Sequence, residues 1–154
     1  MFTARVLYGT ESGNAEMVAD EVAALLNEQG LGLEPEELSD VTPSSLEPGQ
    51  FLFLICSTYE EGDLPASAQP FFEKLAAASP DLSGVHFFGF GLGDTSYEHY
   101  GKAIDTLTEA LTAAGAVAMG EVLKHDALSG TDPAELGVEW ATRSLGSVLS
   151  SSAR

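Results

Sequence analysis

Lysine and arginine are scarce in this chain. Six of them stand against 24 aspartates and glutamates in 154 residues, so the formal net charge at pH 7 is −18. A surface this acidic repels the phosphates of nucleic acids and of anionic membranes, and we therefore expect neither as a partner. It attracts basic proteins and speeds their approach at low salt. Acidity also keeps proteins soluble, so by itself it does not identify a function.

Cysteine and long apolar runs are equally scarce. The single cysteine, Cys56, permits no internal disulfide, and no apolar run approaches the roughly 20 residues that span a bilayer. The first five residues lead straight into a strand-like run without signal-peptide architecture. We therefore expect a soluble cytoplasmic protein. The length suits a single domain, which we expect over residues 1–150, with residues 151–154 as a frayed tail.

Apolar runs that alternate with helical patterns predict an α/β fold. The runs expected to form strands lie within residues 4–8, 31–38, 51–56, 85–90 and 116–123. Helical periodicity covers residues 15–29, 65–78, 101–114 and 133–149. Such alternation is typical of a parallel sheet with helices on both faces, here with five strands. Ligands of these sheets bind beyond the carboxyl ends of the strands, so the loops after the first, third and fourth strands are considered together.

The first of these loops has the composition of a phosphate-binding site. Thr10, Ser12 and Asn14 offer hydrogen bonds between an apolar run and a helix, and the helix N-terminus adds backbone N–H groups and partial positive charge. The loop contains no lysine or arginine, which excludes the P-loop pattern for a triphosphate and its Mg²⁺. A single phosphate monoester fits better. An ordinary capped helix is the alternative, since Ser, Thr and Asn are frequent N-caps.

The loops after the third and fourth strands carry aromatic residues among turn formers. Tyr59 lies in the stretch 57–65, and Tyr97 and Tyr100 lie in the stretch 91–101. Tyr59 and Tyr97 would suit the two walls of a slot for a flat ring system. The alternative is that each tyrosine covers the end of the sheet, because tyrosines are commonly half-buried.

In their order and spacing, the three loops resemble the FMN-binding segments of flavodoxin-like proteins. The resemblance lies in residues 10–15 (TESGNA), 57–63 (STYEEGD) and 91–98 (GLGDTSYE). The chain is most similar to the branch that includes MioC-like flavodoxins and the FMN domains of diflavin reductases, such as cytochrome P450 reductase and the sulfite reductase flavoprotein. The resemblance implies a flavodoxin-like three-layer α/β/α sandwich, a strand order of 2-1-3-4-5, and FMN as the cofactor.

The resemblance also implies a role for each loop. The first binds the FMN phosphate, and the other two flank the isoalloxazine ring, with Tyr59 stacked on one face and Tyr97 on the other. Asp126 is similar to a later acidic residue near the cofactor. The residues expected to bind FMN are Thr10, Glu11, Ser12, Gly13, Asn14, Ala15, Ser57, Thr58, Tyr59, Glu60, Gly62, Leu92, Gly93, Asp94, Tyr97, Tyr100 and Asp126.

Two positions depart from the family's pattern. Glu60 stands where the family often has a glycine, at a peptide that turns over to bond N5–H of the half-reduced flavin. Glycine reaches positive φ without strain and glutamate does not, so we expect Glu60 to disfavour that turn. Asp94 stands where the family usually has asparagine or an equivalent, which alters the polar contacts. Because the three loops hold carboxylates and no Lys or Arg, we expect a flavin potential below that of free FMN.

The resemblance implies an electron carrier without substrate turnover of its own. Its partners would be a basic NAD(P)H-dependent flavodoxin or ferredoxin reductase and a redox acceptor enzyme, and we expect a monomer. A flavodoxin-like NAD(P)H:quinone reductase is the alternative, but it needs room over the ring that Tyr59 and Tyr97 would occupy. A receiver-type signalling domain needs a clustered acidic pocket, whereas the first loop carries hydroxyl groups. We expect no metal, because His86, His99 and His125 lack metal-ligand spacing and suit surface or core positions.

Overall fold

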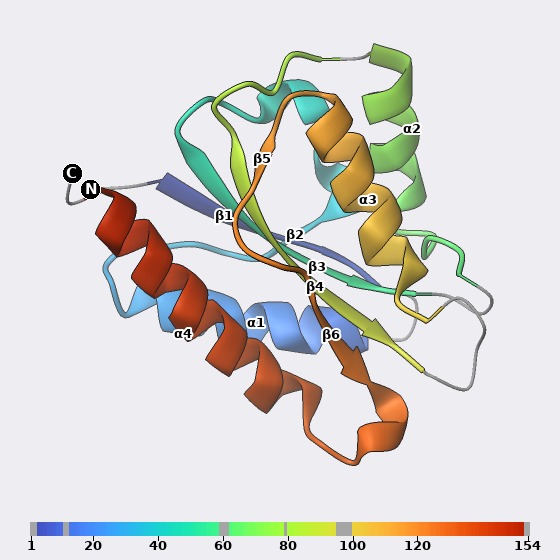
Figure 1. Ribbon diagram of the computed structural model, residues 1–154, viewed down its shortest axis with the longest axis vertical. Coiled ribbons are helices and arrows are strands. Elements are labelled where there is room, and N and C mark those ends of the chain that lie inside the picture. The colour runs from blue at the N-terminus through green and yellow to red at the C-terminus, as the bar shows by residue number, and fades with distance from the viewer. Residues whose placement is uncertain (1–2, 11–12, 59–61, 79, 95–99, 153–154) are drawn as a thin grey trace.

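A parallel sheet lies at the centre of the computed structural model, which describes residues 3–10, 13–58, 62–78, 80–94 and 100–152 (Figure 1). The strand order is β2-β1-β3-β4-β5, as expected, and a sixth short strand, β6, also pairs with β4. The strands are β1 (Thr3–Gly9), β2 (Glu36–Glu37), β3 (Gln50–Ser57), β4 (His86–Gly93), β5 (Val117–Ala118) and β6 (Leu123–Asp126). The α-helices are α1 (Asn14–Asn27), α2 (Gln69–Ala78), α3 (Lys102–Ala113) and α4 (Pro133–Ser152). Three short 3-10 helices are η1 (Leu38–Asp40), η2 (Pro43–Ser45) and η3 (Ala127–Ser129).

Strands β1, β3 and β4 form the buried middle of the sheet. Val6 of β1 lies opposite Phe53 of β3, which in turn lies opposite Phe88 of β4. Side chains alternate between the two faces, so Phe53 and its alternate neighbours enter one core while Leu52 and Leu54 enter the other. Because both faces are covered, β3 is continuously apolar, as the sequence indicated.

The helices form two outer layers. Helices α1 and α4 cover one face of the sheet, and α2 and α3 cover the other (Figure 1). In α1, Val18, Val22 and Leu26 follow helical spacing and are fully buried. Helix α4 approaches α1 closely at Gly137, where a Cβ atom would lie 2.5 Å from Cγ1 of Val18. Trp140 of α4 packs edge-on against the ring of Phe53, with the ring centroids 5.8 Å apart.

The two outer positions of the sheet differ from the expected strands. Strand β2 is only two residues long, because Gly32 adopts a positive φ of 66° and Pro35 brings no N–H group to the ladder. The expected fifth strand is divided into β5 and β6. Ala118 pairs with Phe87, and pairing resumes at Leu123, opposite Phe90. The N–H of Met119 still donates to the carbonyl of Phe87 at 2.8 Å, so strand pairing is interrupted over residues 120–122, and β6 continues three residues beyond the expected end.

Two helix boundaries also differ. Helix α2 begins at Gln69 rather than Pro65, because the amides of Ala68 and Gln69 first return to the carbonyl of Pro65 in a separate turn, at 2.8 and 3.2 Å. Helix α4 continues to Ser152 instead of ending at Leu149, and residues 150–154 contain no glycine or proline that would stop it. Within the described residues, none of the helices has both the length and the apolar character needed to cross a bilayer.

Candidate cofactor-binding site

The start of α1 presents backbone N–H groups at the carboxyl end of β1. Gly13, the residue before the helix, adopts a left-handed conformation with φ 95° and supplies no side-chain cap. The first-turn amides of a helix have no intrahelical acceptor, so those of α1 remain available to an anion. Thr10 shapes this turn, because its Oγ1 atom accepts a hydrogen bond from the N–H of Gly13 at 2.8 Å. This turn is where the sequence predicts a phosphate cradle of neutral donors.

Ser67 lies 57 residues after Thr10 in the chain but bonds directly to the first loop. The Thr10 N–H donates to Oγ of Ser67 at 2.7 Å, and the Ser67 hydroxyl donates back to the Thr10 carbonyl at 3.0 Å. This pair of bonds joins the first loop to the segment that precedes α2. The sequence gives no signal for it, since Ser67 belongs to none of the three motifs.

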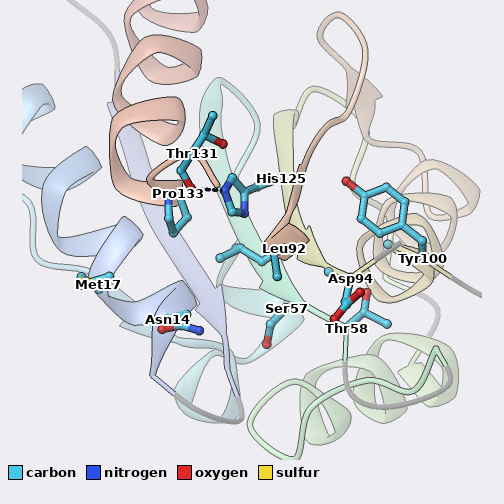
Figure 2. Close-up of a pocket in the computed structure, with 13 residues that line it drawn as sticks. Asn14, Met17, Ser57, Thr58, Leu92, Asp94, Tyr100, His125, Thr131 and Pro133 are labelled. Atoms are coloured by element: carbon cyan, nitrogen blue, oxygen red, sulfur yellow. Dashed lines mark hydrogen bonds between the residues drawn. The ribbon is translucent and has the colours of Figure 1, made fainter. Parts of the chain in front are cut away.

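A cavity of about 420 Å³ opens next to this turn, at the carboxyl ends of β3, β4 and β6 (Figure 2). Its volume lies within the range of small-molecule sites. Residues of α1 and α4 and of the turn before α3 line it, because these three helices begin at this edge of the sheet. The lining residues are Asn14, Met17, Ser57, Thr58, Leu92, Gly93, Asp94, Tyr100, Gly101, His125, Ala127, Thr131 and Pro133.

Thr58 joins the loops after β3 and β4. Its N–H donates to the carbonyl of Leu92 at 2.9 Å, and its Oγ1 atom accepts from the N–H of Ala103, in the first turn of α3, at 3.1 Å. The adjacent hydroxyl of Ser57 lies 3.5 Å from the carbonyl of Gly9. These bonds hold the ends of β1, β3 and β4 in one surface, so Thr58 orients the site as well as lining it.

A lysine that lies outside the three motifs supports the wall formed by Tyr100. The Nζ atom of Lys124 lies 6.0 Å from the centroid of the Tyr100 ring and 2.6 Å from Oδ2 of Asp105 on α3. Burial, and then the negative charge of Asp126, raise the pKa of Tyr100, so this phenol stays neutral at physiological pH. The three loops contain no Lys or Arg, but β6 brings Lys124 beside Tyr100.

The segment from β6 to α4 forms a wall that sequence reasoning missed. His125, Ala127, Thr131 and Pro133 belong to it, and Met17 of α1 lies across the cavity from them (Figure 2). The signal was available, since the carboxyl end of every strand of a parallel sheet lies at this edge. The fifth strand was expected within residues 116–123, and of the segment that follows it only Asp126 was expected at the site.

The structure brings together seven of the expected site residues around the cavity: Asn14, Ser57, Thr58, Leu92, Gly93, Asp94 and Tyr100. Thr10 and Gly13 shape the adjoining turn. The side chain of Ala15 is buried in the core, which leaves only its backbone N–H to face a ligand. Gly62 and Asp126 are described but do not line the cavity, and Oδ1 of Asp126 accepts from the N–H of Leu128 at 3.0 Å. Glu11, Ser12, Tyr59, Glu60 and Tyr97 lie outside the described residues.

Comparison with known proteins identifies the family. The flavodoxin family model matches residues 6–140. The chain belongs to the flavodoxin family. It is 35% identical to protein MioC of Escherichia coli O157:H7 over 135 residues, covering 88% of this chain and 90% of MioC. It is also 34% identical to a flavodoxin of Maridesulfovibrio salexigens, over 79% of this chain and 84% of that one.

Other relatives of this flavodoxin are larger. Human NADPH–cytochrome P450 reductase is 40% identical over 116 residues, which make up 70% of this chain but only 17% of the reductase.

Among solved structures, oxidised flavodoxin 1 from Bacillus cereus superposes with a TM-score of 0.77 at 28% identity, over 91% of this chain and 95% of that one. The chain is therefore an FMN-binding electron-transfer protein, and the quinone reductase alternative is not favoured.

The residues present fit FMN. A phosphate monoester can be held by neutral N–H donors, and the uncapped first turn of α1 supplies them beside Thr10. A flat apolar ring needs a slot, and Leu92, Met17 and Tyr100 line the adjoining cavity. When bound, FMN supplies the electron-transfer chemistry, while the protein binds and orients it. Within the described residues, no group of three His, Cys, Asp or Glu side chains is placed to hold a metal ion.

Proposed function

We propose that FMN binds with its phosphate at the first turn of α1 and its isoalloxazine ring in the cavity beyond β3, β4 and β6. One observation supports this arrangement most directly. Asn14 is the first residue of α1 and also lines the cavity, so the anion-binding turn and the ring site are continuous. The proposal includes hydroxyl donation by Ser12 and stacking by Tyr59 and Tyr97, for which the family's motifs are the support.

In this proposal the chain acts as a one-electron shuttle between a basic NAD(P)H-dependent reductase and a redox acceptor enzyme. It has no substrate turnover of its own and works as a cytoplasmic monomer, with residues 1–150 as a single FMN-binding domain. The net charge of −18 supports a basic partner, because opposite charges raise the rate of encounter. Fluorescence of FMN bound to purified protein, followed by NADPH oxidation with and without a basic flavodoxin reductase, tests both parts.

The phosphate cradle is tested with Thr10→Val and paired flavin titrations. Valine cannot accept the hydrogen bond from the Gly13 N–H, so the turn loses about 1 kcal/mol of support and FMN affinity falls roughly five- to tenfold. Riboflavin lacks the phosphate, so its affinity should be weak and the same in both proteins. Thr112→Val is the matched control, because its hydroxyl bonds only the Thr108 carbonyl on α3.

Equal affinity of the wild-type protein for FMN and riboflavin would contradict the phosphate site. NADPH oxidation by the protein alone would contradict the carrier role, whereas oxidation that appears only when the reductase is added supports it. Reduction rates that stay constant from low to high salt would contradict the basic docking surface, since screening weakens exposed charge attraction.

A further inference from the structure

One ring nitrogen of His125 lies open to the cavity. The imidazole is almost fully buried, with 5% of the residue exposed, and its Nε2 atom lies 2.8 Å from the carbonyl oxygen of Thr131 (Figure 2). A carbonyl oxygen only accepts, so Nε2 carries a hydrogen, and in the neutral ring Nδ1 is therefore the nitrogen with the free lone pair. Nδ1 of His125 has no hydrogen-bond partner among the described residues. In that part of the chain, Nδ1 of His86 is the only unpartnered side-chain nitrogen or oxygen that is buried. Nδ1 of His125 is therefore accessible, and it opens to the cavity that the ring lines.

The position of His125 follows from the sheet. It lies opposite Leu92, at the carboxyl end of β6. Side chains alternate along a strand, so Lys124 and Asp126 point to the opposite face from His125. There Lys124 pairs with Asp105 of α3 and lies beside Tyr100. Lys124, the positively charged residue next to His125 in the sequence, is thus paired with Asp105 on the other face of β6.

The remaining ionisable groups around His125 are acidic or neutral. The loop after β4 contributes Asp94 and the neutral phenol of Tyr100 to the same cavity. At the start of α4, Oδ1 of Asp132 accepts from the N–H of Ala134 at 3.0 Å. On α1, Asn14 and Met17 line the cavity, and neither side chain is ionisable. None of the described residues that line the cavity is Lys or Arg, so an imidazolium at this position is the available source of positive charge.

We propose that His125 takes up a proton at Nδ1 when the bound flavin is reduced, which couples the redox state of the protein to pH. This inference rests on the proposed function. Two electrons from an external reductant and one proton convert FMN into its anionic, fully reduced form. A second proton from solvent goes to Nδ1, and no bond forms between His125 and the flavin. The negative charge gained by the flavin favours the charged imidazole, and histidine changes charge between pH 5 and 8.

The test compares how the two-electron midpoint potential changes with pH in the FMN-loaded wild type and in His125→Gln. The glutamine amide can still donate to the Thr131 carbonyl but does not take up a proton. For each proton taken up with two electrons, the midpoint potential falls by about 30 mV per pH unit. A shift of that size corresponds to a tenfold change in the equilibrium constant of the two-electron reaction. Near neutral pH we expect a slope of about 59 mV per pH unit in the wild type and about 30 in the variant. His86→Gln, at the other end of β4, is the matched control and should keep the wild-type slope.

Imidazole NMR of the wild type gives a second readout that needs no mutation. The His125 signals should show the protonated ring at a higher pH in the reduced than in the oxidised protein, while the His86 signals do not change between the two. Equal potential slopes in wild type and His125→Gln, or His125 signals that titrate alike in both redox states, would overturn the inference. FMN affinity is measured in parallel: absence of binding by the wild type would overturn the proposed function, whereas normal binding with equal slopes overturns only the role of His125.

Discussion

The side chain of Lys124 packs against Gly101, next to the ring of Tyr100. The lysine side chain runs so close to Gly101 that a Cβ atom there would lie 2.5 Å from Cδ of Lys124. Gly101 precedes α3 and has a φ of 68°, in the region where glycine is unstrained. The glycine therefore serves two purposes: it turns the chain into α3 and leaves room for the lysine that reaches Asp105 and the Tyr100 ring.

Substitution of this glycine should destabilise the protein for both reasons. For Gly101→Ala we expect a loss of roughly 1–2 kcal/mol from the left-handed backbone, and on the order of 1 kcal/mol more from displacement of Lys124. Gly30→Ala is the matched control, because Gly30 has a φ of 81° and no atom within 4 Å of the added Cβ. Urea unfolding of the apoproteins measures both changes. Equal losses would show that Lys124 moves aside without consequence.

Tyr8 should make the protein sensitive to alkaline pH. Burial, a hydrogen bond of 2.8 Å to Glu16 and the surrounding carboxylates raise the pKa of Tyr8 well above its usual value. The unfolded chain loses the phenolic proton near pH 10, while the folded protein keeps it. Above that pH the folded state binds more protons, so the free energy of unfolding falls as the pH rises from about 10 toward the folded pKa.

Tyr8→Phe should therefore flatten the alkaline loss of stability. At pH 7 the variant lacks only the bond to Glu16, worth about 1 kcal/mol. Urea unfolding from pH 8 to 11 gives the slope for each protein, and Tyr100, whose pKa is also raised, accounts for the slope that remains. A variant whose stability falls as steeply as that of the wild type would exclude Tyr8 as the source.

At the scale of the elements, the two glycines of α4 show where this helix is packed and where it is free. Gly137 is buried against Val18 of α1, which leaves no room for a methyl group. Gly146 lies two and a half turns further along, exposed and with no atom within 4 Å of an added Cβ. The same residue type thus allows close helix contact at one position and only weakens the helix at the other.

The same substitution should have opposite effects at these two positions. Gly146→Ala should stabilise the apoprotein by about 0.5–1 kcal/mol, because alanine is the better helix former. Gly137→Ala should destabilise it by about 1–3 kcal/mol, because the added methyl group overpacks the contact with Val18. Thermal and urea unfolding report the sign directly. Stabilisation by both changes would mean that α4 can shift away from α1.

The elements that the sequence predicted are those with a clear period. Strand β3 is a continuous apolar run, and α1 and α3 repeat their apolar residues at helical spacing, so the sheet and its layers followed from pattern and from the family resemblance. The end of the fifth strand did not, because Lys124, His125 and Asp126 interrupt the apolar pattern although they pair with β4. One wall of the cavity was therefore missed. Ser67 was missed for another reason, since its bonds to the Thr10 backbone depend on tertiary structure.

At the scale of the whole molecule, charge acts on stability as well as on partners. Within the described residues, ion pairs join Arg5 to Glu36 and Lys124 to Asp105. With a net charge of −18, most carboxylates therefore have other carboxylates as their charged neighbours. Such repulsion opposes the compact state, and dissolved ions reduce it.

Added salt should consequently stabilise the apoprotein. The Debye length falls from about 30 Å at 0.01 M to about 10 Å at 0.1 M, so we expect the thermal midpoint to rise most steeply over this interval. Calorimetry in a sodium chloride series measures the rise. A plateau at higher concentration identifies charge screening, because exclusion of salt from the surface would keep strengthening with concentration. A midpoint that falls with salt would show that attractive pairs dominate.

The short outer strands of the sheet affect how copies of the protein meet. The free N–H and C=O groups of a border strand can pair with a second chain and extend the sheet from one molecule to the next. On one border β2 offers only two residues, Glu36 and Glu37, so the edge that a second copy could extend is short. On the other border the pairing with β4 is interrupted between β5 and β6, over residues 120–122. Both borders thus offer little free strand edge, so we expect this electron carrier to resist edge-to-edge polymerisation when it is concentrated.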